Sequence, residues 1–216
     1  MRNWIKRCGS CFSDRKFIIS LVISFAFLFV AGIINFYAGT YATERASSPV
    51  TDIVLSNIPV FDLDGTFVYG SVLFFIFITL VCFYHPKRLP FTIKSIALFT
   101  VIRSVFISLT HIGPFPIHTF IDPNNLISKF TFGGDLFFSG HTGLPFLMAL
   151  IFWEDKFFRY LFIATSIMFG IVVLLAHLHY SIDVLAAFFI TYTIFKIAIF
   201  LFKKDRELFL KKEKEL

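Results

Sequence analysis

Two segments, FGGDLFFSGHTGLPF (residues 132–146) and LLAHLHYSID (residues 174–183), decide how this chain is organised. Each segment borders an apolar run and carries a histidine, His141 in the first and His179 in the second. We expect both histidines to lie at the same edge of a membrane. The remaining apolar runs then form the scaffold that brings the two segments together.

The amino-acid composition indicates that this protein lies in a membrane. Its 216 residues are 57% hydrophobic and 16% charged, with a mean hydropathy of +0.80. A soluble domain of this size cannot bury so much apolar surface. The pI of about 9.3 and the net charge of +6 would suit nucleic acid, but membrane proteins also collect Lys and Arg in their cytoplasmic loops. The distribution of these charges favours a multi-pass membrane protein without a nucleic-acid partner.

Six apolar runs predict six membrane helices. An α-helix rises about 1.5 Å per residue, so that about 20 residues cross the hydrocarbon core. The fourth run needs part of its flanking sequence to reach this length. We therefore predict an all-α integral membrane protein with one domain (1–216): a basic N-terminal segment (1–16), a six-helix core (17–202) and a charged tail (203–216). The expected spans are residues 17–38, 67–84, 91–112, 142–153, 157–176 and 180–202.

The basic residues predict the orientation of the helices. Of the 20 Lys and Arg residues, all except Arg45, Arg103 and Lys129 fall in the N-terminal segment, around two of the turns, or from Lys196 onward. Because cytoplasmic loops are rich in Lys and Arg, both termini are predicted to be cytoplasmic. Most histidines then gather at or near the luminal or extracytoplasmic face: His111, His118, His141, His177 and His179.

His179 and Asp183 have the spacing of a nucleophile and the group that orients it. Residues i and i+4 share a helix face, so Asp183 can accept the Nδ1 proton of His179 and leave Nε2 free to attack phosphorus. His141 follows Ser139 and Gly140 at the start of a helix, where it can protonate the departing oxygen and where unpaired N–H groups attract phosphate. The pattern predicts phosphate-ester chemistry through a phosphohistidine, with no metal and no cofactor.

These segments resemble a known family. SGHT followed by HYSID resembles the type 2 phosphatidic acid phosphatase superfamily, and the longer strings GGDLFFSGHT and LLAHLHYSIDVLAAFFIT resemble its sphingomyelin synthase branch. The resemblance covers about residues 90 to 200 and extends weakly to Arg103, Thr110 and Asp52. It implies a six-helix fold whose catalytic triad faces the lumen or the exterior. The triad residues would be His141, His179 and Asp183.

Departures from the family pattern bear on the substrate. Gly133 stands where the branch has a cysteine, and Val173 stands where an arginine usually precedes the nucleophilic histidine by six residues. The Lys-x6-Arg-Pro signature of the broader superfamily is absent. A site with few cations is poorly suited to a dianionic phosphomonoester, and it suits a zwitterionic phosphodiester better.

Several residues near the triad have two interpretations. Arg103 lies inside the third span, where a charge facing lipid would cost several kcal/mol; it either pairs with a buried carboxylate or contacts the substrate phosphate. Asp135 either positions a head group or caps a turn, and His177 is either a third catalytic partner or a solvated interface residue. Tyr180, with Phe137 and Phe138, can hold an ammonium head group or pack against other apolar groups. The candidate substrate-binding residues are Arg103, Asp135, Ser139, Gly140, His177 and Tyr180.

The sequence therefore predicts a lipid phosphotransferase or phospholipase C-like enzyme acting on phospholipid and lipid-alcohol substrates in the bilayer. Within the same chemistry, the alternative is a lipid phosphate or isoprenyl diphosphate phosphatase. From a different class, the alternative is a non-catalytic membrane scaffold or transporter built on the same helices.

Two other motifs have simpler interpretations. VFDLDGT (residues 60–66) matches the nucleophile motif of the haloacid dehalogenase phosphatases, but the next apolar run begins at Phe67 and leaves no room for a soluble α/β domain, so we predict a turn. Cys8 and Cys11 form a CxxC pair without a second ligand pair, which disfavours zinc. Reversible acylation of these cysteines is a further hypothesis.

Overall fold

The computed structural model describes residues 11–119 and 134–210, and within these ranges it contains helices and turns but no strand. The all-α prediction is thus confirmed for this part of the chain. Two short 3₁₀ helices, η1 (Leu55–Asn57) and η2 (Pro86–Arg88), accompany the α-helices. The α-helices are α2 (Arg15–Glu44), α3 (Asp64–Tyr84), α4 (Leu89–Leu109), α5 (Gly140–Ile151), α6 (Lys156–Leu175), α7 (Ser181–Leu201) and α8 (Lys203–Leu210).

Five helices are long and apolar enough to cross a membrane, namely α2, α3, α4 with its preceding 3₁₀ turn, α6 and α7. Helix α5, which lies in the fourth predicted span, has only 12 residues. At about 1.5 Å per residue it is roughly 18 Å long, well short of a hydrocarbon core of about 30 Å. The protein is therefore an integral membrane protein, in which the described residues form five helices long enough to cross a membrane and two shorter ones, α5 and α8.

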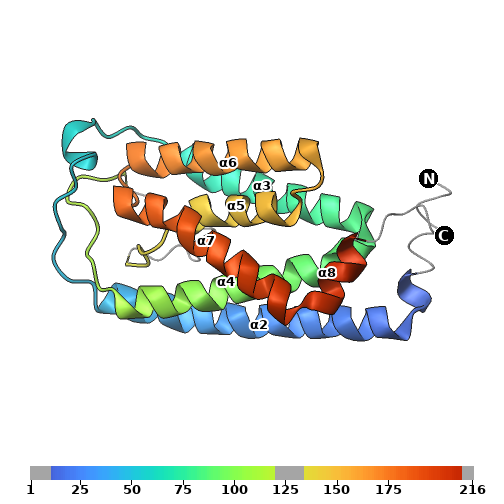
Figure 1. Ribbon diagram of the computed structural model, residues 1–216. Coiled ribbons are helices and arrows are strands. Elements are labelled where there is room, and N and C mark those ends of the chain that lie inside the picture. The colour runs from blue at the N-terminus through green and yellow to red at the C-terminus, as the bar shows by residue number, and fades with distance from the viewer. Residues whose placement is uncertain (1–10, 120–133, 211–216) are drawn as a thin grey trace.

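The short helix α5 is surrounded by the others. It packs against α6, α7 and α4, and Figure 1 shows it in the middle of the bundle. Its start is fixed by the Ser139 side chain, which accepts the Thr142 N–H. Its end is fixed by the charged turn that follows, where Asp155 caps α6 by accepting the Phe158 N–H at 3.3 Å. A helix enclosed by protein does not need to span the bilayer.

Backbone hydrogen bonds join the helix ends at one end of the bundle, on the left of Figure 1. The loop after α2 is joined to the end of α4 by the Ser47 N–H, which donates to the His111 carbonyl at 2.8 Å. The segment before α3 is joined to the end of α6 by the Phe61 N–H, which donates to the Leu175 carbonyl at 2.9 Å. The starts of α5 and α7 are joined by the Ser139 N–H, which donates to the Asp183 carbonyl at 3.2 Å. Both histidine-bearing segments therefore lie at this end, as the sequence predicted.

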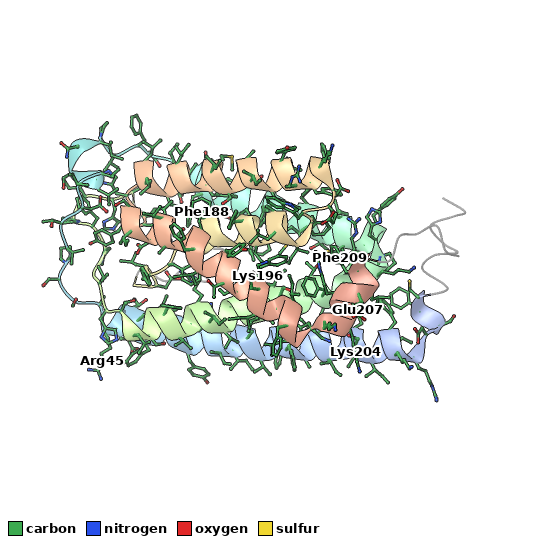
Figure 2. All side chains as sticks on the ribbon, viewed as in Figure 1. Arg45, Phe188, Lys196, Lys204, Glu207 and Phe209 are labelled. Atoms are coloured by element: carbon green, nitrogen blue, oxygen red, sulfur yellow. The ribbon has the colours of Figure 1, made fainter. Side chains whose placement is uncertain are left out.

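Helix α8 closes the opposite end of the bundle. Figure 2 shows Lys204, Glu207 and Phe209 along α8, far from Arg45 at the end of α2. The sequence predicted only a charged tail here, but Phe209 is buried and its ring lies 5.4 Å from that of Phe152. Two of the charges of α8 are turned inward to partners, which is why a polar segment can pack against the bundle.

A buried charge cluster attaches α8 to α4 and α2. The Lys94 ammonium lies 2.6 Å from the Asp205 carboxylate, and the two side chains are only 9% and 12% exposed. Ser20 accepts from the Lys94 ammonium at 2.9 Å and donates to the other oxygen of Asp205. Arg206 donates to the Ile151 carbonyl at the end of α5 at 2.9 Å. The charges are therefore satisfied inside the protein.

Removal of the Asp205 carboxylate should destabilise the fold, because it leaves the Lys94 ammonium buried without a counter-ion. For Asp205→Ala we expect a loss of about 3 kcal/mol in the free energy of unfolding, measured as a lower thermal midpoint in detergent. Glu207→Ala, an exposed position on the same helix, is the control, and Lys94→Met with Asp205→Leu should recover most of the loss. Equal midpoints for Asp205→Ala and Glu207→Ala would contradict the role of the pair.

Candidate active site

His179 and Asp183 lie together at the start of α7. The Nδ1 atom of His179 is 3.4 Å from Oδ2 of Asp183, and the Asp183 side chain is fully buried. The same carboxylate oxygen accepts the Tyr180 N–H at 2.9 Å, which holds the carboxylate at the helix start. Oδ1 of Asp183 is buried without a hydrogen-bond partner. An N–H on Nδ1 directed at this carboxylate leaves Nε2 of His179 with a free lone pair.

His141 is the second residue of α5 and faces the start of α3. Its ring lies 4.1 Å from the ring of Phe67 and 6.0 Å from the ring of Phe169, measured between centroids. Electrostatic interactions link His141 to His179 and to Arg103. His141 and His179 therefore lie at the starts of two helices that the Ser139 N–H joins by donating to the Asp183 carbonyl.

Ser139 and Gly140 serve the structure of the helix start. Ser139 is completely buried, caps α5, and accepts a hydrogen bond from the Thr142 hydroxyl at 3.2 Å. A side chain at Gly140 would place its Cβ 3.2 Å from Nε of Arg103. Glycine at this position therefore allows the guanidinium of Arg103 to pack against the first turn of α5.

Arg103 is buried, and within the described residues its hydrogen bonds go to the loop before α5. Its Nε donates to the Phe138 carbonyl at 2.9 Å, and its Nη2 donates to the Asp135 carbonyl at 2.6 Å. Its Nη1 lies 3.1 Å from Oδ2 of Asp135. Of the two interpretations of Arg103, the pairing with a buried carboxylate is the one that the geometry supports. Burial raises the pKa of Asp135, although the charges of Arg103 and His179 oppose that shift.

Gly134 anchors the other end of this loop segment. Its N–H donates to Oγ1 of Thr43 at 3.2 Å, and a Cβ at this position would lie only 2.6 Å from the Thr43 Cα. The close approach of the loop to α2 therefore requires glycine. Gly133, the residue that departs from the family pattern, lies outside the described residues, as do Cys8 and Lys129.

The Tyr180 side chain is buried and makes hydrogen bonds to other parts of the protein. Its ring is 2% exposed, its hydroxyl donates to the Gly113 carbonyl at 2.8 Å, and the same hydroxyl accepts the Val50 N–H at 3.2 Å. Phe138 is fully buried between Phe99 and Phe106. The predicted contact of these rings with a head group stays untested, and the contacts present are those of packing.

His177 is directed toward the segment before residue 120 instead of toward the triad. Its Nδ1 lies 2.8 Å from the Ile117 carbonyl, and its ring packs edge-on against Phe115 at 5.3 Å. Its backbone has a φ of 54°, a left-handed conformation that forms the sharp turn between α6 and α7. Within the described residues, no hydrogen bond joins His177 to His141, His179 or Asp183.

Asp52 supports the site in a way that the sequence did not reveal. Its carboxylate accepts the Ser181 N–H at 2.7 Å and the N–H groups of Val54 and Leu55 at 2.8 and 3.1 Å. Burial alone would raise the pKa of Asp52, but these hydrogen bonds lower it below its ordinary value. Asp52 thereby fastens the first loop to the start of α7. The only sequence signal was its weak match to the family pattern.

The described residues contain no group of three or more His, Cys, Asp or Glu side chains arranged to hold a metal ion. The candidate site brings together the two imidazoles, the carboxylate beside His179, and the Arg103–Asp135 ion pair. Such a group can bind a phosphorus centre, attack it and move a proton.

Comparison with protein families gives one match that includes this site. Residues 133–199 match a family model described as PAP2 superfamily C-terminal. Comparison with curated proteins and with solved structures gives no significant match. The matched segment contains His141, His179 and Asp183, together with α5, α6 and nearly all of α7. The match therefore relates this part of the chain to the PAP2 superfamily.

Proposed function

We propose that this protein is a membrane lipid phosphotransferase or phospholipase C-like enzyme. It passes the head-group phosphate of a phospholipid through a phosphohistidine to a lipid alcohol, as a sphingomyelin synthase-like enzyme does, or to water. The proposal is carried by one observation: the helix starts that bear His141 and His179 are hydrogen-bonded to each other through Ser139 and Asp183. Two imidazoles fixed in this way can act on opposite sides of one phosphorus.

In the first step, Nε2 of His179 attacks phosphorus, and a P–N bond forms while the P–O bond to the diacylglycerol oxygen breaks. The proton on Nδ1 stays between His179 and Asp183, whose negative charge stabilises the phosphorylated imidazolium. Protonated His141 gives its proton to the departing oxygen. The negative charge of the bound phosphate favours this protonated state of His141.

In the second step, the neutral imidazole of His141 takes the proton of the acceptor hydroxyl. The acceptor oxygen attacks phosphorus, the P–N bond breaks, and His179 returns to its neutral form. A lipid alcohol as acceptor makes a new phosphodiester, whereas water releases the head-group phosphate. Both histidines end in the states in which they began, so the cycle balances without a cofactor.

We also propose that the site faces the lumen or the exterior and that both termini are cytoplasmic. Supporting this, Arg45 and the paired Arg103 are the only Lys or Arg residues at the site end among the described residues. The opposite end carries most of the others, including Lys87, Arg159 and Lys203. Cytoplasmic loops have this bias.

A lipid phosphate or isoprenyl diphosphate phosphatase uses the same two steps with a phosphomonoester or diphosphate. A scaffold or transporter needs neither histidine. An assay of purified protein in detergent with labelled phospholipid separates the three proposals. Release of diacylglycerol supports the first, activity on phosphomonoesters alone supports the second, and no product from either kind of lipid supports the third.

His179→Ala should abolish turnover, because it removes the atom that bonds to phosphorus. We expect kcat to fall on the order of 1,000-fold or more, with an unchanged thermal midpoint, measured as diacylglycerol release. His85→Ala is the control, since His85 follows α3 at the opposite end of the bundle. Equal activity of wild type and His179→Ala would exclude His179 as the nucleophile.

Asp183→Asn should separate the two roles of Asp183. The amide oxygen can still accept the Tyr180 N–H, so the helix start should be kept. The amide cannot stabilise a positively charged His179, so kcat should fall on the order of 100-fold or more. Asp183→Ala should lose the same activity and also about 1 kcal/mol of stability. Unfolding curves and kcat for both variants test this, and an active Asp183→Asn protein would contradict the orienting role.

A further inference from the structure

The ion pair of Arg103 and Asp135 lies beside both catalytic imidazoles. Arg103 interacts electrostatically with His141, and Asp135 interacts electrostatically with His179. The guanidinium also packs against Gly140, the residue before His141.

The charge of Arg103 is already matched inside the protein. Arg103 is 8% exposed, and its three nitrogens donate to the Asp135 carboxylate, the Asp135 carbonyl and the Phe138 carbonyl. The Asp135 side chain is 21% exposed, so its carboxylate is not completely enclosed by the protein. A phosphate in the site therefore meets a neutral pair instead of a free cation.

The pairing of Arg103 with Asp135 affects substrates differently according to the number of negative charges on their phosphate. A phosphodiester carries one negative charge, whereas a phosphomonoester approaches two at neutral pH. The second charge would interact favourably with a free guanidinium and unfavourably with a nearby carboxylate, and both effects are stronger where little water is present.

We propose that Asp135 is a specificity-determining residue: by pairing with Arg103 it disfavours dianionic phosphomonoesters and leaves phosphodiesters as the preferred substrates. This inference rests on the proposed function and assigns its substrate class to one ion pair. Asp135 acts through charge, without forming or breaking a bond.

Three variants test the ion pair, with kcat/KM for phosphatidate and for phosphatidylcholine measured in mixed micelles. Asp135→Asn keeps an oxygen for Nη1 of Arg103 and removes the negative charge. It should raise the ratio of kcat/KM for phosphatidate to kcat/KM for phosphatidylcholine about 10-fold. Arg103→Gln leaves the Asp135 carboxylate unpaired. It should lower the ratio of kcat/KM for phosphatidate to kcat/KM for phosphatidylcholine below the wild-type ratio. Asp135→Asn with Arg103→Gln should return the ratio close to wild type.

The control is Asp62→Asn, which removes an exposed carboxylate before α3 at the same end of the bundle and should leave the ratio unchanged. The opposite shifts of the single variants keep the test decisive if one of them does not fold. An unchanged ratio in a folded single variant overturns the inference. A ratio that changes in Asp135→Asn only through lost activity on phosphatidylcholine also overturns it, because that result assigns the carboxylate to the ammonium head group.

Failure of the proposed function has a different signature. Wild-type protein that turns over neither lipid, or a His179→Ala variant that stays active, refutes the enzyme mechanism. Wild-type protein that uses phosphatidylcholine through His179, with a ratio indifferent to Asp135, refutes the specificity inference alone.

Discussion

Asp183 holds the candidate site together, because one of its contacts joins the two histidine-bearing segments and the others fix His179 and the start of α7. Its carboxylate accepts the Tyr180 N–H and lies against Nδ1 of His179, while its backbone carbonyl accepts the Ser139 N–H. One residue thus starts α7, orients the proposed nucleophile and aligns the start of α5. The carboxylate is fully buried, so each of these bonds acts where water competes little.

The shortness of α5 is the structural consequence of placing a site there. A helix with 12 residues cannot cross the bilayer, and α5 is instead supported by the helices around it. At the end that bears His141, α5 is held by the loop before it, whose carbonyls accept hydrogen bonds from Arg103. At its other end Arg206 donates to the Ile151 carbonyl, and the Phe209 ring packs on Phe152. The α8 contacts therefore belong to the same support that fixes His141.

The sequence predicted the parts that depend on local pattern. Apolar runs predicted the positions of the helices, because lipid requires continuous apolar surface, and the spacing of His179 and Asp183 predicted their contact. The parts that it missed depend on distant partners. The burial of Asp205 depends on its ion pair with Lys94, and the link between the first loop and α7 depends on the hydrogen bond from the Ser181 N–H to Asp52. Arg103 had two interpretations until the loop carbonyls at Asp135 and Phe138 were placed beside it. The enclosure of α5 depends on the helices that surround it, which no local pattern encodes.

The central claim is that two imidazoles share one phosphorus and that His179 carries it between donor and acceptor. Rapid quenching with phospholipid labelled at phosphorus, followed by peptide mapping, tests this most directly. We expect the phosphorus label on His179 and expect it to be lost in acid and kept in alkali, as a phosphorus–nitrogen bond requires. The label should be absent from His179→Ala. Turnover by the wild-type protein with the label on another residue, or with no covalent label at any time, would contradict it.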